Sequence, residues 1–384
     1  MKSYNHLFEK LIDHDNIYNA ILRASKHKKD RAEVRKVLAN INRYVYRLQD
    51  LLINKKLKIR KHNAILIEDG ARRKRRLIVK PDFVFEQILH HALVRVLAPI
   101  FMKSMYKWSC GSLPKRGGLY GKRYLEKYIK YHPKNIKYVA KGDVKHFFQE
   151  VNIDVVKSLL CKKIHDKKFL EVMYLVLDSN IATYQGEDVY MGLPIGYYLS
   201  QWLANWLLSD LDHKVKEQLK IKCYVRYVDD FVLMSGNKKE LHKALLAIRL
   251  MLTELRLKIK ENYQVFRFIY NAKSGQERGR IIDFMGFKFF RNGRTTLRKN
   301  ILLKATRKAL KMMNKPSYNW YEATQLISYI GWFKHTNTYL IYETRIQPFV
   351  NIGKCKKIIS LHSKRKDKQN VINLEERRKF RRTA

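Results

Sequence analysis

The sequence predicts an α+β fold, and three observations lead to that prediction. Apolar residues recur at helical spacing through the first sixty residues, from Leu7 to Leu52. Two apolar, strand-like runs are each followed by an aspartate, Asp143 in one case and Asp229 in the other. Beyond Asn300 the sequence again reads as helices. We therefore expect helices combined with a sheet that carries both aspartates.

The expected elements follow one another without an internal repeat. The runs NAILIE and RRLIVK should pair as a hairpin, because Asp69-Gly70 between them is a turn signal. Gly and Pro cluster in SCGSLPKRGGLYG, which predicts a loop. The remaining elements are helices over 82–97, from 122, from 153, from 167, over 197–220 and 238–255 and between 300 and 345, a strand KYVAKGDV, and hairpins over 223–234 and in IIDFMGFKFFRNG.

The charge balance indicates a polyanionic partner. The 384 residues include 80 Lys and Arg against 34 Asp and Glu, which gives a net charge of +46. Solubility alone does not require such an excess, and most ordinary metabolic enzymes lack it. With 46% hydrophobic residues the chain can still bury a sizeable core. These values favour a globular protein that binds nucleic acid, ahead of one that binds an anionic membrane surface.

The cysteines and the apolar segments predict a cytoplasmic protein without a membrane span. The cysteines form no motif of metal-ligand spacing and are interpreted as reduced thiols. The N-terminus lacks the apolar stretch of a secretory signal. Residues 189–209 carry no charge, but their Gly, Pro and polar residues favour a loop that runs into a buried helix.

The run CYVRYVDDFVLMS carries the strongest chemical signal. Asp229 and Asp230 are adjacent at a tight turn between two apolar strands, where two like charges are costly without a cation. Bound Mg²⁺ would compensate that repulsion and could activate a hydroxyl for attack on a phosphate. The alternative is an ordinary acidic hairpin turn, because Asp is a common turn residue.

The run KYVAKGDVKHFFQEVN supplies a third acid. If the two strands lie side by side in one sheet, Asp143 and Asp229 can reach a shared metal ion. The alternative for Asp143 is a helix cap or turn residue. Phe147 can be a core residue. Phe148 would stand where its ring can press on the sugar of an incoming nucleotide and exclude a 2′-hydroxyl.

An ordered set of motifs over roughly residues 60–340 resembles reverse transcriptases with a right-hand polymerase fold. The set is RRKRRLIVKP, SCGSLPKRGG, KGDVKHFF, MGLPIGYYLSQWLANWLL, RYVDDFVLM and DFMGFKFF. Within that superfamily, IGYYLSQ is similar to the pattern of reverse transcriptases from diversity-generating retroelements, whereas group II intron and retron relatives usually carry Gln-Gly-x-x-x-Ser-Pro. The helical N-terminal region also fits that subfamily.

The resemblance implies roles for individual residues. The catalytic acids are Asp143, Asp229 and Asp230, which with the backbone carbonyl of Val144 would hold two Mg²⁺ ions. The residues implied to bind the incoming nucleotide are Lys74, Arg76, Phe148, Ile195, Gly196 and Gln201. The residues implied to bind nucleic acid are Arg72, Arg73, Arg75, Lys115, Arg116, Arg307 and Lys311.

Several of these positions keep a second interpretation or depart from the family pattern. RRKRR could serve only as a phosphate-binding patch or a localisation-like cluster, and Ser200 and Gln201 could be packing residues. Arg226 and Tyr227 could be cross-strand structural residues. Glu86-Gln87 replaces the usual Asp-Arg, and Lys260 is the nearest candidate for a lysine that protonates pyrophosphate.

The resemblance also implies a division of the chain. The expected parts are a helical region 1–60, fingers 61–137, a first palm segment 138–152, fingers and palm helices 153–189, palm 190–295, thumb 296–350 and a basic tail 351–384. The tail has 12 Lys and Arg against 3 Asp and Glu, so it is expected to be frayed, with a short helix near Leu374.

The function implied by the resemblance is that of an RNA-directed DNA polymerase, bacterial or phage-encoded. It would copy a template-repeat RNA with dNTPs into adenine-mutagenised cDNA for mutagenic retrohoming, and bind the cDNA/RNA duplex. A pentameric, basic accessory variability protein would assist it. The alternatives are a group II intron or retron-like enzyme and, in another class, a non-catalytic RNA-binding protein with the same fold. The three acids disfavour the binding protein.

Overall fold

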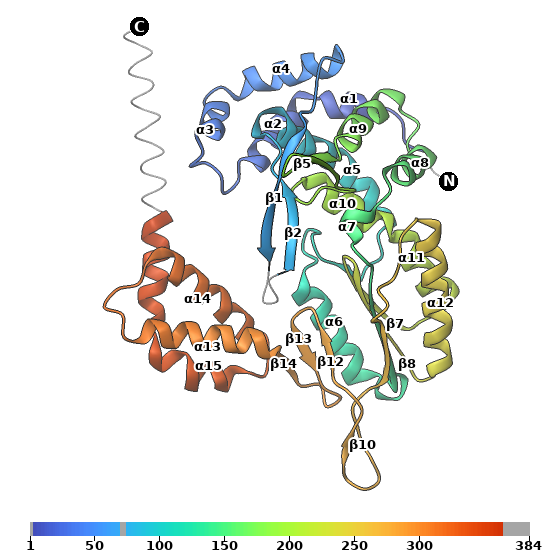
Figure 1. Cartoon of the computed structure of the whole chain (residues 1–384), viewed down its shortest axis with the longest axis vertical. Helices are drawn as coiled ribbons and strands as arrows, with labels where there is room; N and C mark the ends of the chain where they lie inside the picture. The colour runs from blue at the N-terminus through green and yellow to red at the C-terminus, as the bar shows by residue number, and fades with distance from the viewer. Residues whose placement is uncertain (1–2, 70–73, 364–384) are drawn as a thin grey trace. The chain divides into compact units, whose positions relative to one another are not determined.

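A computed structural model describes residues 3–69 and 74–363, which combine helices with small sheets, as an α+β fold requires (Figure 1). The chain forms two units. The first comprises Met1–Gly117, Ala140–Leu233 and Lys238–Val265, and the second Gly118–Val139, Met234–Asn237 and Phe266–Ala384. The predicted α+β class is confirmed.

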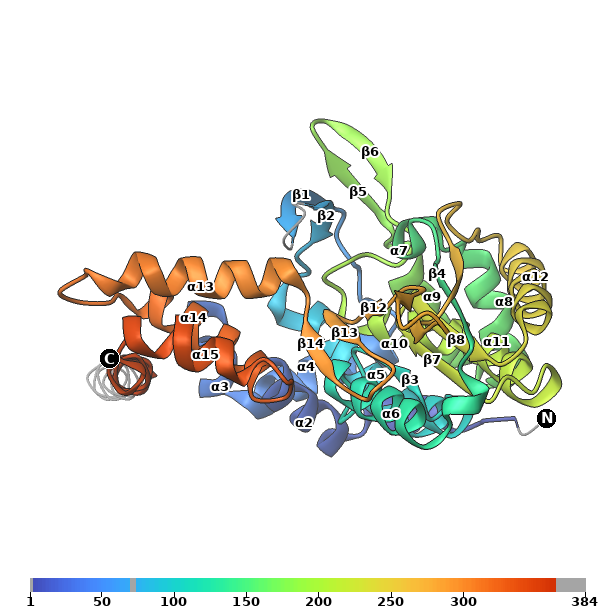
Figure 2. The same ribbon diagram turned by 90° about the horizontal axis from the view of Figure 1, so that it is seen from below.

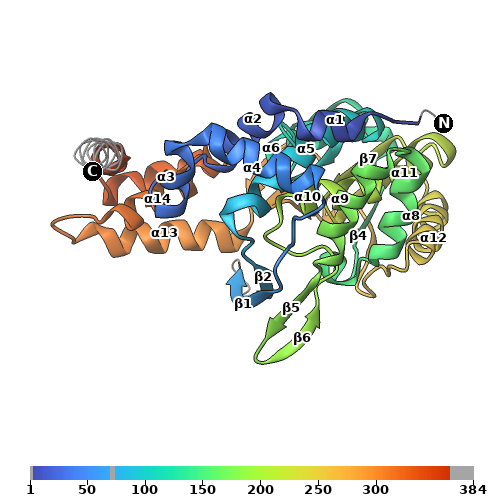
Figure 3. The same ribbon diagram turned by 90° about the horizontal axis from the view of Figure 1, so that it is seen from above.

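The helical N-terminal region forms as predicted. Its helices are α1 (Leu7–Ile12), α2 (His14–Ala24), α3 (Ala32–Ala39) and α4 (Ile41–Ile53). Asp13 caps α2 by accepting a hydrogen bond from the backbone N–H of Asn16 at 2.8 Å. The apolar face of α2 packs against α5 (Ile88–Ser104), and α5 packs against α10 (Tyr198–Leu207) (Figure 3).

Two hairpins share one sheet in the first unit. The predicted pair forms as β1 (His62–Asp69) and β2 (Lys74–Val79), which are antiparallel. A second hairpin, β5 (Ile181–Tyr184) and β6 (Glu187–Tyr190), joins it because β5 is parallel to β1, and the sheet order is β2-β1-β5-β6 (Figure 2). The second hairpin was not predicted from the sequence. Its strands are only four residues long, and its turn, Gln185-Gly186, is not among the strong turn signals.

A five-stranded sheet carries the predicted acids. Its order is β3 (Ser109–Cys110), β7 (Cys223–Tyr227), β8 (Asp230–Ser235), β4 (Tyr138–Asp143) and β9 (Gln264–Arg267). Strands β7 and β8 are buried along nearly their whole length, which is typical of strands covered on both faces. Besides α10, the helices of the first unit that follow β4 are α7 (Phe147–Glu150), α8 (Ile153–Lys163), α9 (Lys167–Asp178), α11 (Ser209–His213), the π-helical turn η3 (Lys214–Gln218) and α12 (Lys238–Glu254).

The second unit contains most of the remaining elements. Helix α6 (Gly118–Tyr131) is followed by the 3-10 turn η2 (Pro133–Asn135). The strands are β10 (Tyr270–Asn271) with β11 (Glu277–Arg278), and the antiparallel set β12 (Ile282–Phe284), β13 (Phe287–Phe289) and β14 (Thr295–Leu297). They lead into α13 (Lys299–Met313), α14 (Trp320–Phe333), α15 (Tyr339–Arg345) and the 3-10 turn η4 (Gln347–Phe349). Helices α13 and α14 pack together (Figure 1).

Five predicted boundaries are wrong. The helix expected over 82–97 begins only at Ile88, because Phe85 has a φ of 71° and interrupts the preceding π-helical turn η1 (Phe83–Gln87), and it continues to Ser104. The helix expected near 122 already begins at Gly118, and the helix expected over 197–220 is broken after Leu207. Residues 352–363 are helical and not frayed. Gly70 of the predicted turn and the segment around Leu374 fall outside the described residues.

One described segment passes the length and composition test for a membrane span. It is Phe83–Ser104, and half of its most apolar stretch is buried inside the protein. Helices at the core of a fold pass the same test. Here α5 is packed against α2 and α10, as a core helix is.

Candidate active site

The structure places Asp143 beside the turn that carries Asp229. Asp143 ends β4, and the backbone N–H of the next residue, Val144, donates to the carbonyl oxygen of Asp229 at 3.3 Å. Asp230 begins β8, on the other side of the same turn. All three aspartates are half-buried. The ends of neighbouring strands therefore bring the three predicted acids into one region.

The turn between β7 and β8 is strained. Val228, its first residue, has a φ of 58°, which is unusual for a β-branched side chain. Such a conformation costs about 1–3 kcal/mol and persists only when its surroundings enforce it. The N–H of Val228 donates to the carbonyl of Cys110 at 3.0 Å, and a Cβ at Gly111 would lie only 2.8 Å from Cγ2 of Val228. The segment Ser109-Cys110-Gly111 thus holds the turn between β7 and β8, which carries Asp229 and Asp230.

A buried ion pair holds the turn from the other side. Nε and Nη2 of Arg226 donate to the two carboxylate oxygens of Asp212 at 2.8 and 2.6 Å, and both side chains are almost completely buried. Nη1 donates to the carbonyl of Val228 at 2.7 Å and Nη2 to the carbonyl of Asn205 at 3.1 Å. The hydroxyl of Tyr224 also donates to Asp212, at 2.6 Å. The network links the turn to α10 and α11, so Arg226 is a structural residue that positions the acids.

The charges of this network are stable at ordinary pH. Burial disfavours the guanidinium of Arg226, but the adjacent charge of Asp212 outweighs it and raises the pKa of Arg226 above its ordinary value. Burial, followed by the charge of Asp212, raises the pKa of Tyr224. Arg226 therefore stays charged and Tyr224 stays neutral.

The carboxylate of Asp143 is only partly satisfied. Its Oδ2 is paired with Nζ of Lys260, whose backbone N–H donates to the carbonyl of Asp143 at 2.8 Å. Its Oδ1 is buried and accepts no hydrogen bond from any residue that the structure describes. The predicted proton-donor candidate, Lys260, therefore lies against a predicted metal ligand.

The donors in this region fit an oxygen-coordinated divalent cation. Carboxylate and backbone carbonyl oxygens are the ligands that Mg²⁺ prefers, and the unsatisfied Oδ1 of Asp143 is one of them. Within residues 3–69 and 74–363, no three His, Cys, Asp or Glu side chains are gathered as a metal-binding group. The structure thus brings the three acids to one region without closing them around a common point.

The segment around Ile195 connects α7 to β2. The N–H of Leu193 donates to the carbonyl of Phe148 at 2.7 Å, and the N–H of Val79 donates to the carbonyl of Ile195 at 2.8 Å. At Gly196, where φ is 119°, a Cβ would overlap the carbonyl oxygen of Val79. Only glycine fits there. The segment therefore joins the strand that carries Lys74 and Arg76 to the helix that carries Phe148.

The two phenylalanines after Asp143 differ in burial. Phe147 is buried, as a core residue should be, whereas Phe148 is half-buried, and their rings meet edge to face at 5.6 Å. The ring of Phe148 is thus partly accessible to a ligand.

The predicted nucleic-acid residues are distributed over both units. In the first unit Arg75 and Lys115 are exposed, whereas Arg116 uses its guanidinium to bind the carbonyl of Tyr106 at 3.0 Å. Arg307 and Lys311 are exposed one turn apart on α13 of the second unit. Arg72 and Arg73 fall outside the described residues.

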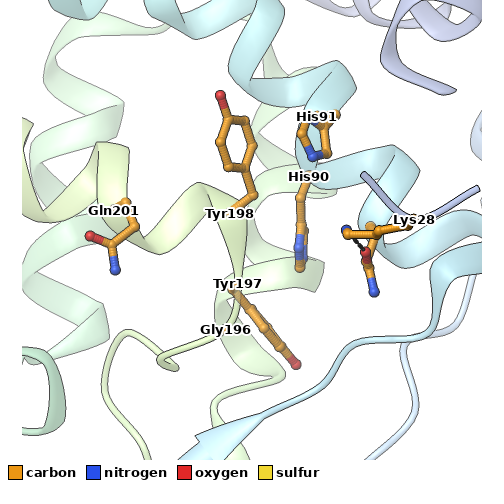
Figure 4. Close-up of a pocket in the computed structure, with 8 residues that line it drawn as sticks. Lys28, His90, His91, Gly196, Tyr197, Tyr198 and Gln201 are labelled. Atoms are coloured by element: carbon orange, nitrogen blue, oxygen red, sulfur yellow. Dashed lines mark hydrogen bonds between the residues drawn. The ribbon is translucent and has the colours of Figure 1, made fainter. Parts of the chain in front are cut away.

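A cavity of about 280 Å³ lies beside the predicted nucleotide-binding residues Gly196 and Gln201 (Figure 4). Its other lining residues are Lys28, Gln87, His90, His91, Tyr197 and Tyr198. Tyr197 and Tyr198 belong to the motif IGYYLSQ and Gln87 to the pair Glu86-Gln87, but no motif marks Lys28, His90 or His91, and none of the six was predicted to line a cavity.

Comparison with known protein families identifies the family of the chain. The family model "Reverse transcriptase (RNA-dependent DNA polymerase)" matches residues 59–289, more than half of the chain. A solved structure of telomerase from Candida albicans, in complex with the TWJ fragment of telomeric RNA, is similar at 14% identity and a TM-score of 0.44, over 76% of this chain and 56% of that chain. No curated protein matches. By the family match, the chain belongs to the reverse transcriptases, the RNA-dependent DNA polymerases, and has their right-hand fold.

Proposed function

We propose that this reverse transcriptase copies a template-repeat RNA into adenine-mutagenised cDNA within a diversity-generating retroelement. The observation that carries the proposal is the position of Ile195, a half-buried aliphatic residue whose backbone is bonded to β2 beside the nucleotide-binding residues. An aliphatic side chain there offers contact area but no directional hydrogen bond. The proposal includes a cytoplasmic location and a pentameric basic accessory protein, both of which rest on the sequence resemblance.

Reverse transcriptases generally use divalent metal ions, and we propose that two Mg²⁺ ions bind here. Asp143, Asp229, Asp230 and the carbonyl of Val144 would hold them. Bound ions would supply activation of the primer 3′-hydroxyl and stabilisation of charge on the phosphate. The protein positions these ligands through the strained turn, and Lys260 holds one oxygen of Asp143.

We further propose that residues 61–137 form the fingers, that residues 138–152 and 190–295 form the palm, and that α13 to α15, within residues 296–350, form the thumb. The exposed Arg307 and Lys311 on α13 would contact phosphates of the cDNA/RNA duplex. Such contacts fix position without reading sequence.

Extension of a primed RNA by the purified full-length protein tests the proposed function. We expect cDNA in the presence of Mg²⁺, with substitutions concentrated opposite template adenines. Accurate cDNA would favour a group II intron or retron-like enzyme. RNA binding without extension would favour a non-catalytic binding protein.

Substitution of Phe148 by alanine is expected to admit ribonucleotides. The half-buried ring is the proposed wall against a 2′-hydroxyl, and its truncation opens space there. Single-nucleotide extension with each rNTP and dNTP measures the selectivity. The matched control is Phe147→Leu, which alters the buried neighbour and should lower stability without changing selectivity. Unchanged selectivity in Phe148→Ala would place the sugar gate elsewhere.

Substitution of Ile195 by glutamine is expected to lower misincorporation opposite template adenine more than opposite the other bases. A buried hydrogen bond contributes about 0.5–1.5 kcal/mol, which corresponds to roughly two- to tenfold in discrimination. Sequencing of cDNA made from one RNA by both enzymes measures the change. Ile181→Gln, at an exposed isoleucine of β5, is the control. An equal change at all four bases would reject Ile195 as the source of the bias.

A further inference from the structure

We propose that the cavity of Figure 4 binds one unpaired nucleotide, with the base among the aromatic side chains and the phosphate at Lys28. The inference rests on the proposed use of an RNA template, and we assign the nucleotide to the RNA strand. A free dNTP also carries a base and a phosphate, so the test must distinguish a nucleotide of the RNA strand from a free dNTP.

The lining of the cavity selects for this class of ligand. Among residues 3–69 and 74–363, those that line it supply one lysine, two amides, two imidazoles and two phenols, and no carboxylate. The absence of acid disfavours a metal ion and favours a ligand with negative charge. A volume of about 280 Å³ is far more than the ~30 Å³ share of one water molecule, so a planar ring system has room.

His90 provides an unused donor and acceptor in this cavity. Its side chain is 1% exposed, and neither ring nitrogen has a hydrogen-bond partner among the described residues. Burial lowers the pKa of His90 to about 3, so the ring is neutral and carries one N–H donor and one acceptor. Buried polar groups in native proteins are nearly always paired. Figure 4 shows the ring of His90 in the region between Tyr197 and Lys28, where a base edge could pair with it.

Tyr198 provides a stacking surface. One face of its ring stacks on His91, at 4.1 Å between centroids and 12° between planes, while 38% of the residue remains exposed. Burial, followed by the charges of Lys28 and Arg23, lowers the pKa of His91 to about 4, so this pair of rings is uncharged. Bases of single strands stack on such aromatic side chains irrespective of sequence.

Lys28 provides the charge for a phosphate. It lies in the connection between α2 and α3, whose sequence KHKKDR contains four Lys or Arg and one Asp. Nζ of Lys28 donates to Oε1 of Gln87 at 2.6 Å, which is a neutral acceptor, and the charges that act on Lys28 are those of Arg31 and Glu33. Lys28 is half-buried, and a charge that is partly removed from water interacts more strongly with an anion.

The cavity adjoins the segment proposed to line the nucleotide pocket. Gly196 belongs to its wall and lies against the carbonyl of Val79 at the end of β2. A nucleotide held here would be next to the bases proposed to be copied.

Binding of short single-stranded RNA to the full-length protein tests the inference, because it requires no polymerisation. In fluorescence anisotropy, Tyr198→Ala should weaken binding about 5- to 150-fold, as expected for the loss of one stacked base. Tyr131→Ala, at an exposed tyrosine of the second unit, is the matched control and should leave affinity unchanged. The KM for dNTPs on a primed template should also stay unchanged in Tyr198→Ala.

The variant His90→Phe distinguishes a role of His90 in ligand binding from a role in protein stability. It removes an unpaired buried polar ring and keeps a similar shape, so Tm should be equal or higher while RNA affinity falls. Unchanged RNA affinity in both variants would overturn the inference. A raised KM for dNTPs with unchanged RNA affinity would overturn the assignment to the RNA strand and identify a free nucleotide as the ligand. Wild-type RNA binding without cDNA synthesis would contradict the proposed function alone.

Discussion

Asp229→Asn is expected to abolish cDNA synthesis while RNA binding stays nearly unchanged. The substitution removes a carboxylate from the region where β4 and the turn between β7 and β8 meet, but it leaves the basic surface intact. The amide is nearly isosteric, so the strained turn at Val228 should persist. Primer extension in Mg²⁺ measures activity, and anisotropy with the same RNA measures binding.

The matched control for this prediction is Asp188→Asn, at an exposed acid of β6 that pairs with Lys61. It removes one carboxylate from the same unit, outside the proposed site, and should retain extension. Retained extension in Asp229→Asn would instead show that the acid is not required for the reaction. Loss of RNA binding in that variant would show that the substitution disturbs more than the site.

Arg226→Met is expected to lower the free energy of unfolding by about 3–5 kcal/mol, because it leaves the fully buried charge of Asp212 without its partner. Asp212→Asn should also be destabilising, because it leaves the buried charge of Arg226 without its partner. In the double variant the loss should be smaller than the sum of the two single losses, since neither charge is left alone. Guanidinium unfolding at pH 7 measures all three.

Arg298→Met is the control, because the Arg298–Asp283 pair is partly exposed. Its loss should cost at most about 1 kcal/mol. Additive effects in the Arg226 and Asp212 variants would contradict the interpretation that the two side chains act as a pair. A stable Arg226→Met variant with normal extension would show that the turn does not need this support.

The sequence predicted the elements whose signals are local. The strand before Asp143 and the hairpin around Asp229 follow from apolar runs and turn residues, and the N-terminal helices follow from their periodicity. The motifs, read together, also predicted the family.

The interactions that hold the site were not predictable, because they join distant segments. Arg226 meets Asp212 across 14 residues and Asn205 across 21. Asp143 meets Lys260 across 117 residues. His90 lies in an apolar helix, and only the packing of α5 on its neighbours shows that its ring nitrogens have no hydrogen-bond partner in the part of the chain that the structure describes.

The contact between Gly196 and Val79 connects β2 with the segment around Ile195, and both are proposed to contact the nucleotide. The N–H of Val79 in β2 is bonded to the carbonyl of Ile195, and no side chain fits at residue 196, so a movement of β2 at this point would disturb the neighbouring segment. A mispaired base that displaced Ile195 would displace the strand of Lys74 and Arg76 as well. If Ile195 and the residues of β2 contact the nucleotide as proposed, base pairing and triphosphate binding share this one backbone connection.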